Sequence, residues 1–80
     1  MAYRLALVTY ADYEPEMLER DKRALIEFLT INNGTRFKDL SGNLMMVDGR
    51  VHCAVHSLRL EGKLEIRHEG SERGKCYLPS

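Results

Sequence analysis

The spacing of apolar residues predicts three helices. Over residues 15–32, apolar side chains recur close to every third or fourth position, and charged residues occupy the other face. The same spacing appears in residues 35–44, and residues 48–61 carry an i, i+3, i+4, i+7 stripe. The apolar positions are Leu18, Leu25, Phe28 and Leu29; Phe37, Leu40 and Leu44; and Val51, Ala54, Val55 and Leu58.

Residues that start and stop helices flank these stretches. Pro15 lies within an acidic cluster, as suits the first turn of a helix. Either Asn33 or Gly34 can take the left-handed conformation that ends this first helix. Thr35 and Asp48 are predicted N-caps of the second and third helices.

After Gly62 the period of the pattern changes from helical to alternating. Leu64 and Ile66 alternate with charged residues, as in a half-buried strand, and residues 75–78 form a second short apolar stretch. We therefore expect a β-hairpin over residues 63–78. Three helices followed by a hairpin make the expected fold class α+β.

The first 13 residues lie outside this pattern. Leu5, Leu7 and Val8 would place apolar side chains on both faces of a strand. Such a segment is a strand covered on both sides, a short helix, or a surface that packs against a partner chain. We expect residues 1–13 to form the contact of a homodimer.

Length and composition favour one domain that works by binding. The chain has 80 residues, of which 44% are hydrophobic and 30% charged, as in an ordinary globular domain. The longest apolar run near the N-terminus has four residues, against the roughly 18 needed to span a membrane. Two cysteines make no disulfide framework, which favours a reducing, cytoplasmic setting. No catalytic triad or phosphate-binding glycine loop is present, so we expect neither enzyme activity nor a cofactor.

The formal net charge of zero hides a small asymmetry. Residues 1–34 carry four basic and six acidic side chains, whereas residues 35–80 carry eight basic and six acidic ones. All three histidines also lie in the second half. An anionic partner is therefore expected on the C-terminal side of the chain.

The helices and hairpin together resemble the winged helix-turn-helix domains of small bacterial or phage transcriptional regulators. The resemblance runs from about Ala24 to Leu78. In that superfamily the recognition helix shows Val-x-x-Ala-aliphatic-x-x-Leu, then three residues, then Gly-x-aliphatic leading into the wing. This chain has Val51, Ala54, Val55, Leu58, Gly62 and Leu64 at those positions.

The resemblance implies a single winged-helix domain over residues 1–80 that binds double-stranded DNA and regulates transcription. The recognition helix, residues 48–61, would expose Gly49 with other small or polar residues, and the wing, residues 63–78, would include His68 and Ser71. Some winged helices bind protein instead, and the neutral charge favours that alternative function. The DNA-contacting residues that the resemblance implies are Arg36, Lys38, Arg50, His52, Cys53, His56, Ser57, Arg59, Arg67, Arg73 and Lys75.

Two further chemistries depend on histidine and cysteine. His52 and His56 have the i, i+4 spacing that can hold zinc, with Cys53 beside them, but the set is too sparse to predict a metal site. Cys53 and Cys76 would form a redox pair only if the fold brought them together. We expect no metal.

Overall fold

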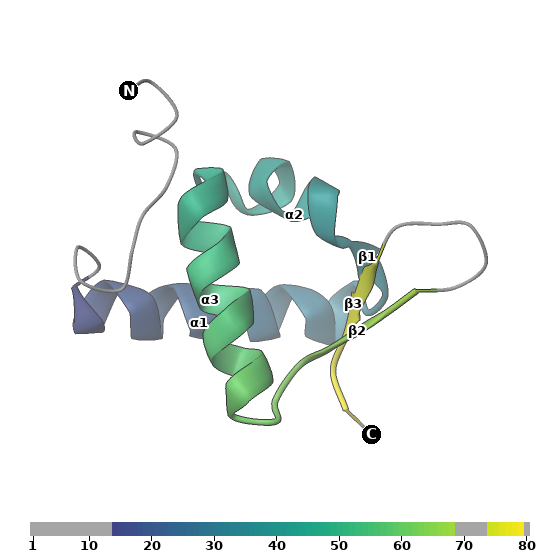
Figure 1. Cartoon of the computed structure of the whole chain (residues 1–80). Helices are drawn as coiled ribbons and strands as arrows, with labels where there is room; N and C mark the ends of the chain where they lie inside the picture. The colour runs from purple at the N-terminus through teal and green to yellow at the C-terminus, as the bar shows by residue number, and fades with distance from the viewer. Residues whose placement is uncertain (1–13, 69–73, 80) are drawn as a thin grey trace.

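The computed structural model describes residues 14–68 and 74–79 and confirms the predicted α+β fold class. Residues 1–13, with the predicted dimer contact, and residues 69–73, with Arg73, lie outside the described residues. Figure 1 shows a winged-helix-like arrangement of helices with a small sheet beside them. The described elements are α1 (Pro15–Ile31), β1 (Thr35–Arg36), α2 (Phe37–Leu44), α3 (Asp48–Leu60), β2 (Glu65–Arg67) and β3 (Lys75–Tyr77).

Helix α1 begins at Pro15, where a missing backbone N–H costs nothing because the first turn has no partner for it. It ends at Ile31, and the backbone N–H of Asn32 donates to the carbonyl of Phe28 at 2.8 Å. Gly34 has a φ of +88°, so it provides the left-handed turn that leads into β1.

The predicted N-caps of the second and third helices are wrong. Thr35 lies in β1, where it pairs with Cys76, and the residue before α2 is Arg36. The extended backbone of Thr35, which we predicted to belong to a helix cap, instead forms the β1 pairing with β3. Asp48 is the first residue of α3 rather than its cap, which is Val47.

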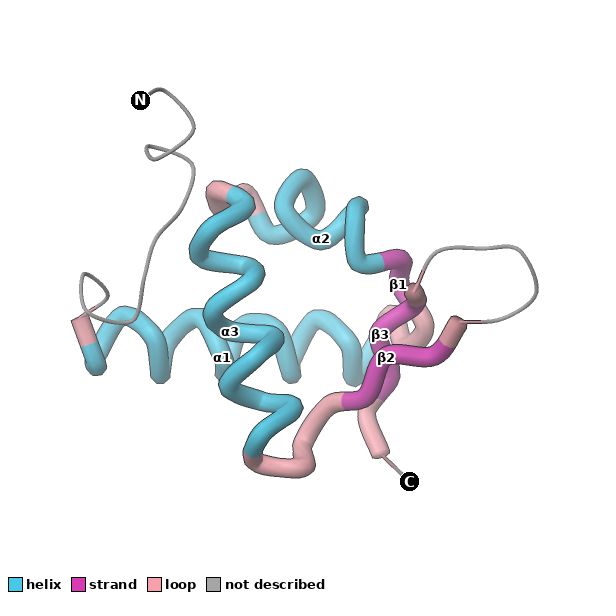
Figure 2. Tube along the Cα trace, viewed as in Figure 1, coloured by secondary structure: helices cyan, strands magenta, loops and turns pink. Residues whose placement is uncertain are grey.

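The sheet has three strands in the order β1-β3-β2, and both pairings are antiparallel. Cys76 in the middle strand pairs with Thr35 on one side and with Ile66 on the other. Figure 2 shows this sheet at one end of the helices, close to the end of α1 and the start of α2. The strands β2 and β3 form the predicted hairpin, and β1 adds a third strand that the sequence pattern does not reveal.

One apolar core joins the three helices to the sheet. Helix α1 crosses behind α3 in Figure 1, and the apolar stripe of α3 packs Leu58 and its neighbours into the core at that crossing. The buried cluster is Leu25, Leu29, Leu40, Val51, Ala54, Val55, Leu58, Leu64 and Cys76.

Two charged side chains of α1 hold α3 at opposite ends. Asp21, only 4% exposed, accepts two hydrogen bonds from the Arg50 guanidinium, at 2.9 Å from Nε and 2.7 Å from an Nη atom. Lys22, 7% exposed, donates to Glu61 at 2.6 Å and to Glu19 at 2.9 Å. These bonds raise the pKa of Arg50 and of Lys22 and lower the pKa of Glu61. The orientation of α3 on α1 is therefore fixed by charge as well as by apolar packing.

Candidate functional site

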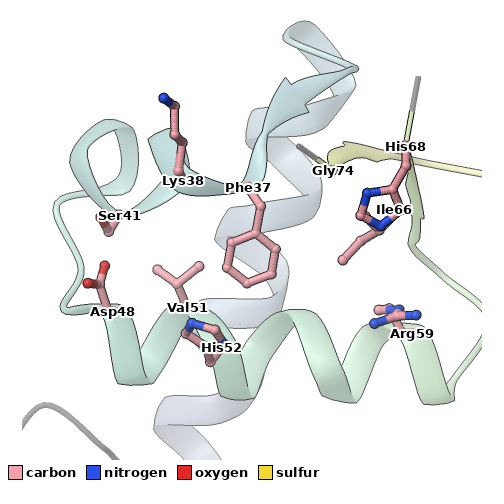
Figure 3. A pocket seen from close by; sticks show the side chains of 10 residues that line it. All are labelled: Phe37, Lys38, Ser41, Asp48, Val51, His52, Arg59, Ile66, His68 and Gly74. Carbon is pink, nitrogen blue, oxygen red and sulfur yellow. The ribbon is translucent and has the colours of Figure 1, made fainter. Parts of the chain in front are cut away.

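A groove of about 800 Å³ lies between α2, α3 and the β2–β3 hairpin (Figure 3). All three elements contribute side chains to it, so it forms only in the folded chain. Its lining residues are Phe37, Lys38, Ser41, Asp48, Val51, His52, Arg59, Ile66, His68 and Gly74.

The middle of the groove is apolar and aromatic. The ring of Phe37 lies against the imidazole of His52, with centroids 4.9 Å apart and planes tilted by 50°. Val51 lies next to this pair and Ile66 faces it from the hairpin (Figure 3). The backbone N–H of Phe37 donates to the carbonyl of Gly74 at 3.0 Å, which fixes the start of α2 against the hairpin.

The two ends of the groove differ in charge. Ser41 and Asp48 lie at one end, and Arg59 and His68 lie at the other (Figure 3). Asp48 and Arg59 are both on α3, 11 residues apart in the sequence, which corresponds to about 16 Å along a helix axis. Lys38 stands at the rim with its ammonium group pointing away from α3 (Figure 3). A carboxylate therefore lies at one end of the groove and a guanidinium lies at the other.

The cations of this groove are available to a ligand. Within residues 14–68 and 74–79, neither Lys38 nor Arg59 forms an ion pair or a side-chain hydrogen bond. Asp48 likewise has no ion-pair partner among these residues, and α3 has no side-chain cap. By contrast, Arg50 and Lys22 are already bound to carboxylates between α1 and α3.

Three of the predicted contact residues line this groove: Lys38, His52 and Arg59. His56 is exposed on α3 and Ser57 is half-buried, but neither lines the groove. Phe37, Ser41, Asp48 and Ile66 line the groove without having been predicted as contacts. The apolar spacing assigns Phe37 and Ile66 to the core, so the sequence alone carries no signal for their second role.

The predicted exposed face of the third helix is partly wrong. Cys53 is only 8% exposed and Gly49 is buried, because α3 is covered around more of its circumference than its apolar stripe requires. Arg50 is half-buried and its guanidinium is held by Asp21. Arg50 therefore has a structural partner in place of a free, outward-pointing side chain.

The remaining predicted contacts lie around β1 and the hairpin. Arg36 binds Asp39 at 3.1 Å, and each side chain exposes a little under half of its surface. Arg67 binds Glu65 at 2.6 Å and lies 4.2 Å above the ring of Tyr77. The remaining contact on the hairpin, in β3, is the half-buried Lys75.

In the described residues the two cysteines are buried, and candidate metal-ligating side chains do not gather at one point. Cys53 and Cys76 are not joined in a disulfide, and burial raises the pKa of the Cys53 thiol and raises that of Cys76 to about 11. Over residues 14–68 and 74–79, no group of three or more His, Cys, Asp or Glu side chains is placed to hold a metal ion.

Comparisons of the chain with protein-family models, with curated proteins and with solved structures find no match. In the described part of the chain, no helix has both the length and the apolar character needed to cross a membrane.

Proposed function

We propose that this protein is a sequence-specific DNA-binding transcriptional regulator of the winged helix-turn-helix type. In this proposal α3 enters the major groove, and the β2–β3 hairpin lies on the adjacent backbone or minor groove. The major groove of B-DNA is wide enough for an α-helix, and base edges there carry the sequence information. The protein acts by occupying DNA in the cytoplasm and catalyses no reaction.

The observation that carries this proposal is the distribution of unpaired charge. Lys38 and Arg59 lack ion-pair partners in the described residues and share one groove with His52 and His68. By contrast, Asp21 pairs with Arg50, and Glu61 pairs with the buried Lys22 of α1. Cations without partners attract the phosphates of DNA even when the formal net charge of the protein is zero.

Each element of this face has a separate role in the proposed complex. Arg59 and His56 are exposed on α3 and would reach base edges, Arg59 as a bidentate partner of guanine. Lys38, in the first turn of α2, would bind a backbone phosphate, which gives affinity without sequence preference. Arg67 and Lys75 would place the hairpin on the adjacent backbone.

A homodimer would extend the contact to two half-sites. A single small domain touches few base pairs, and linking two domains makes the second contact effectively intramolecular. We assign this dimer contact to residues 1–13, where apolar residues exceed what the helical pattern needs.

The proposal is tested by titrating duplex DNA at several salt concentrations against wild type, Arg59→Ala, Lys38→Ala and a control. Arg59→Ala should weaken the binding free energy at the preferred site by about 1–3 kcal/mol. The ratio of its affinities for the preferred site and for random DNA should also fall. Lys38→Ala should weaken binding to all DNA sequences alike. It should also make the slope of log affinity against log salt concentration shallower by about one unit. The matched control is Arg23→Ala, which removes the same charge from an exposed position on α1, outside the groove. Equal effects of all three substitutions, or no binding by wild type at low salt, would exclude this proposal.

The second candidate function is a protein-interaction module, and the turn between α2 and α3 favours it. Met45 is 91% exposed and Val47 is 57% exposed, so this turn presents two neighbouring apolar side chains to solvent. Met45 also has a φ of +56°, a conformation that residues other than glycine seldom adopt. If wild type binds no DNA, substitution of Met45 and Val47 by serine is the direct test of a protein contact there.

A further inference from the structure

The groove between α2, α3 and the hairpin has the polarity of a nucleotide site. A carboxylate and a hydroxyl, from Asp48 and Ser41, lie at one end, and Arg59 with His68 lies at the other (Figure 3). An apolar and aromatic stretch separates them. A duplex presents only phosphates along its backbone, so a backbone strand would leave the Asp48 carboxylate facing negative charge. A ligand matched to the whole groove carries an anion at one end and hydrogen-bond donors at the other.

We propose that this groove binds a nucleoside monophosphate whose base carries an exocyclic amino group, and that bound nucleotide and duplex DNA exclude each other. The exclusion rests on the proposed DNA-binding function, because it requires that the duplex cover the same face. Nucleotide binding itself does not depend on that function.

Arg59 and His68 would hold the phosphate. A guanidinium offers donors in a planar fork that fits two phosphate oxygens, and Arg59 has no partner among the described residues that would compete. His68, which follows β2, lies on the same side of Phe37 as Arg59 (Figure 3). The phosphate would therefore be held between α3 and the hairpin.

Phe37 and His52 would hold the base. A nucleobase stacks on aromatic rings whatever its identity, because every base has a flat π-face. The tilted contact of the two rings, at 4.9 Å, leaves Phe37 only half-buried, with its edge directed along the groove (Figure 3). A volume of about 800 Å³ is sufficient for a ligand of this class, since small-molecule sites span about 300–1,000 Å³.

Asp48 would select the base. An ionised carboxylate only accepts hydrogen bonds, whereas adenine and cytosine carry an amino group that donates them. Uracil presents a carbonyl oxygen where cytosine has its amino group, so the hydrogen bond from that position to the carboxylate would be lost. Since Asp48 neither caps α3 nor pairs with a cation in the described residues, its carboxylate is free to make this contact.

The test is a titration of AMP, CMP, UMP and inorganic phosphate into the full chain, followed by amide shifts in ¹⁵N–¹H NMR spectra. AMP and CMP should move the amides of Phe37, His52 and His68, with binding about tenfold tighter than that of UMP. Arg59→Ala should weaken all three nucleotides and phosphate by about tenfold, whereas Asp48→Ala should abolish only the preference over UMP. Arg23→Ala, on the outer side of α1, should change none of these values. Unmoved groove amides at about 10 mM nucleotide, or equal binding of CMP and UMP by wild type, would overturn the inference.

Two further measurements distinguish a free nucleotide from single-stranded nucleic acid as the ligand, and distinguish failure of nucleotide binding from failure of DNA binding. An oligocytidylate that binds where CMP does not would overturn the free-nucleotide site in favour of single-stranded nucleic acid. Displacement of a labelled duplex by CMP but not by an equal concentration of UMP supports mutual exclusion, and no displacement overturns it. Nucleotide binding without any duplex binding retains the site and removes the DNA-binding function, so the two failures are distinguishable.

Discussion

At the scale of single residues, the contact between Asp21 and Arg50 shows how a surface-type side chain becomes part of the core. The Asp21 carboxylate is nearly enclosed, and both of its oxygens accept hydrogen bonds from the same guanidinium. A carboxylate in such a place is stable only while its partner stays. Arg50 is thus held in the fold, 29 positions along the chain from its partner.

Replacing Arg50 by alanine should therefore lower the free energy of unfolding by about 3 kcal/mol, because the buried charge of Asp21 loses its partner. Urea denaturation of the wild type and the variant measures this loss. Asp21→Asn with Arg50→Met removes both charges at similar volume and should restore much of it. This structural role would be contradicted if Arg50→Ala lost affinity for DNA while its free energy of unfolding stayed that of the wild type.

At the scale of elements, α3 depends on its apolar stripe. Leu58 is completely buried at the crossing of α3 and α1. Leu58→Ala should destabilise the domain by about 2–5 kcal/mol, since it removes apolar contact and leaves a cavity. The urea midpoint measures this effect, and Leu60→Ala is the control because Leu60 is 74% exposed on the same helix. Equal effects at both positions would mean that the stripe does not direct the packing.

The helices and the hairpin could be predicted because their signals are local. Apolar spacing defines α1, α2 and α3 within a few residues, and Gly62, with a φ of +73°, marks the change to strand period. Strand β1 could not be predicted, because two residues are too few to show alternation. Its existence depends on hydrogen bonds to β3, about 40 residues later in the chain.

The groove was less accessible to prediction than the fold. Helical spacing correctly separates His52 and Arg59 from the α3 core, but it cannot show that Asp21 captures Arg50. Nor can it show that Phe37 is shared between core and groove, because the groove wall opposite comes from Ile66 on the hairpin. Side chains from distant segments share a site only after folding, and no periodicity within one segment records this.

At the scale of the whole molecule, the buried thiol of Cys76 should make the free energy of unfolding fall as the pH rises above 9. Burial raises its pKa from 9.0 to about 11, so the folded chain holds the proton more tightly than the unfolded chain. The stabilisation is complete below pH 9 and is lost as the pH rises toward 11, at up to about 1.4 kcal/mol per pH unit.

Urea unfolding at several pH values between 8 and 11 checks this prediction. Cys76→Ala lowers stability at every pH, but the part of the pH dependence that belongs to the thiol should disappear. Parallel curves for the wild type and Cys76→Ala across this range would show that the thiol titrates alike in both states.

The order of strands in the sheet also decides when the molecule can be completed during its synthesis. β3 lies between β1 and β2, yet it is the last of the three to leave the ribosome. At about 5–20 residues per second, the interval between β1 and β3 lasts roughly 2–8 s. Until β3 is made, both β1 and β2 lack the strand with which they pair. The helices can pack before β3 is made, because the Asp21–Arg50 contact and most of the apolar cluster lie within residues 21–64. Until β3 is made, the nascent chain can therefore pair none of the strands of the sheet, although residues of its helical core are already present.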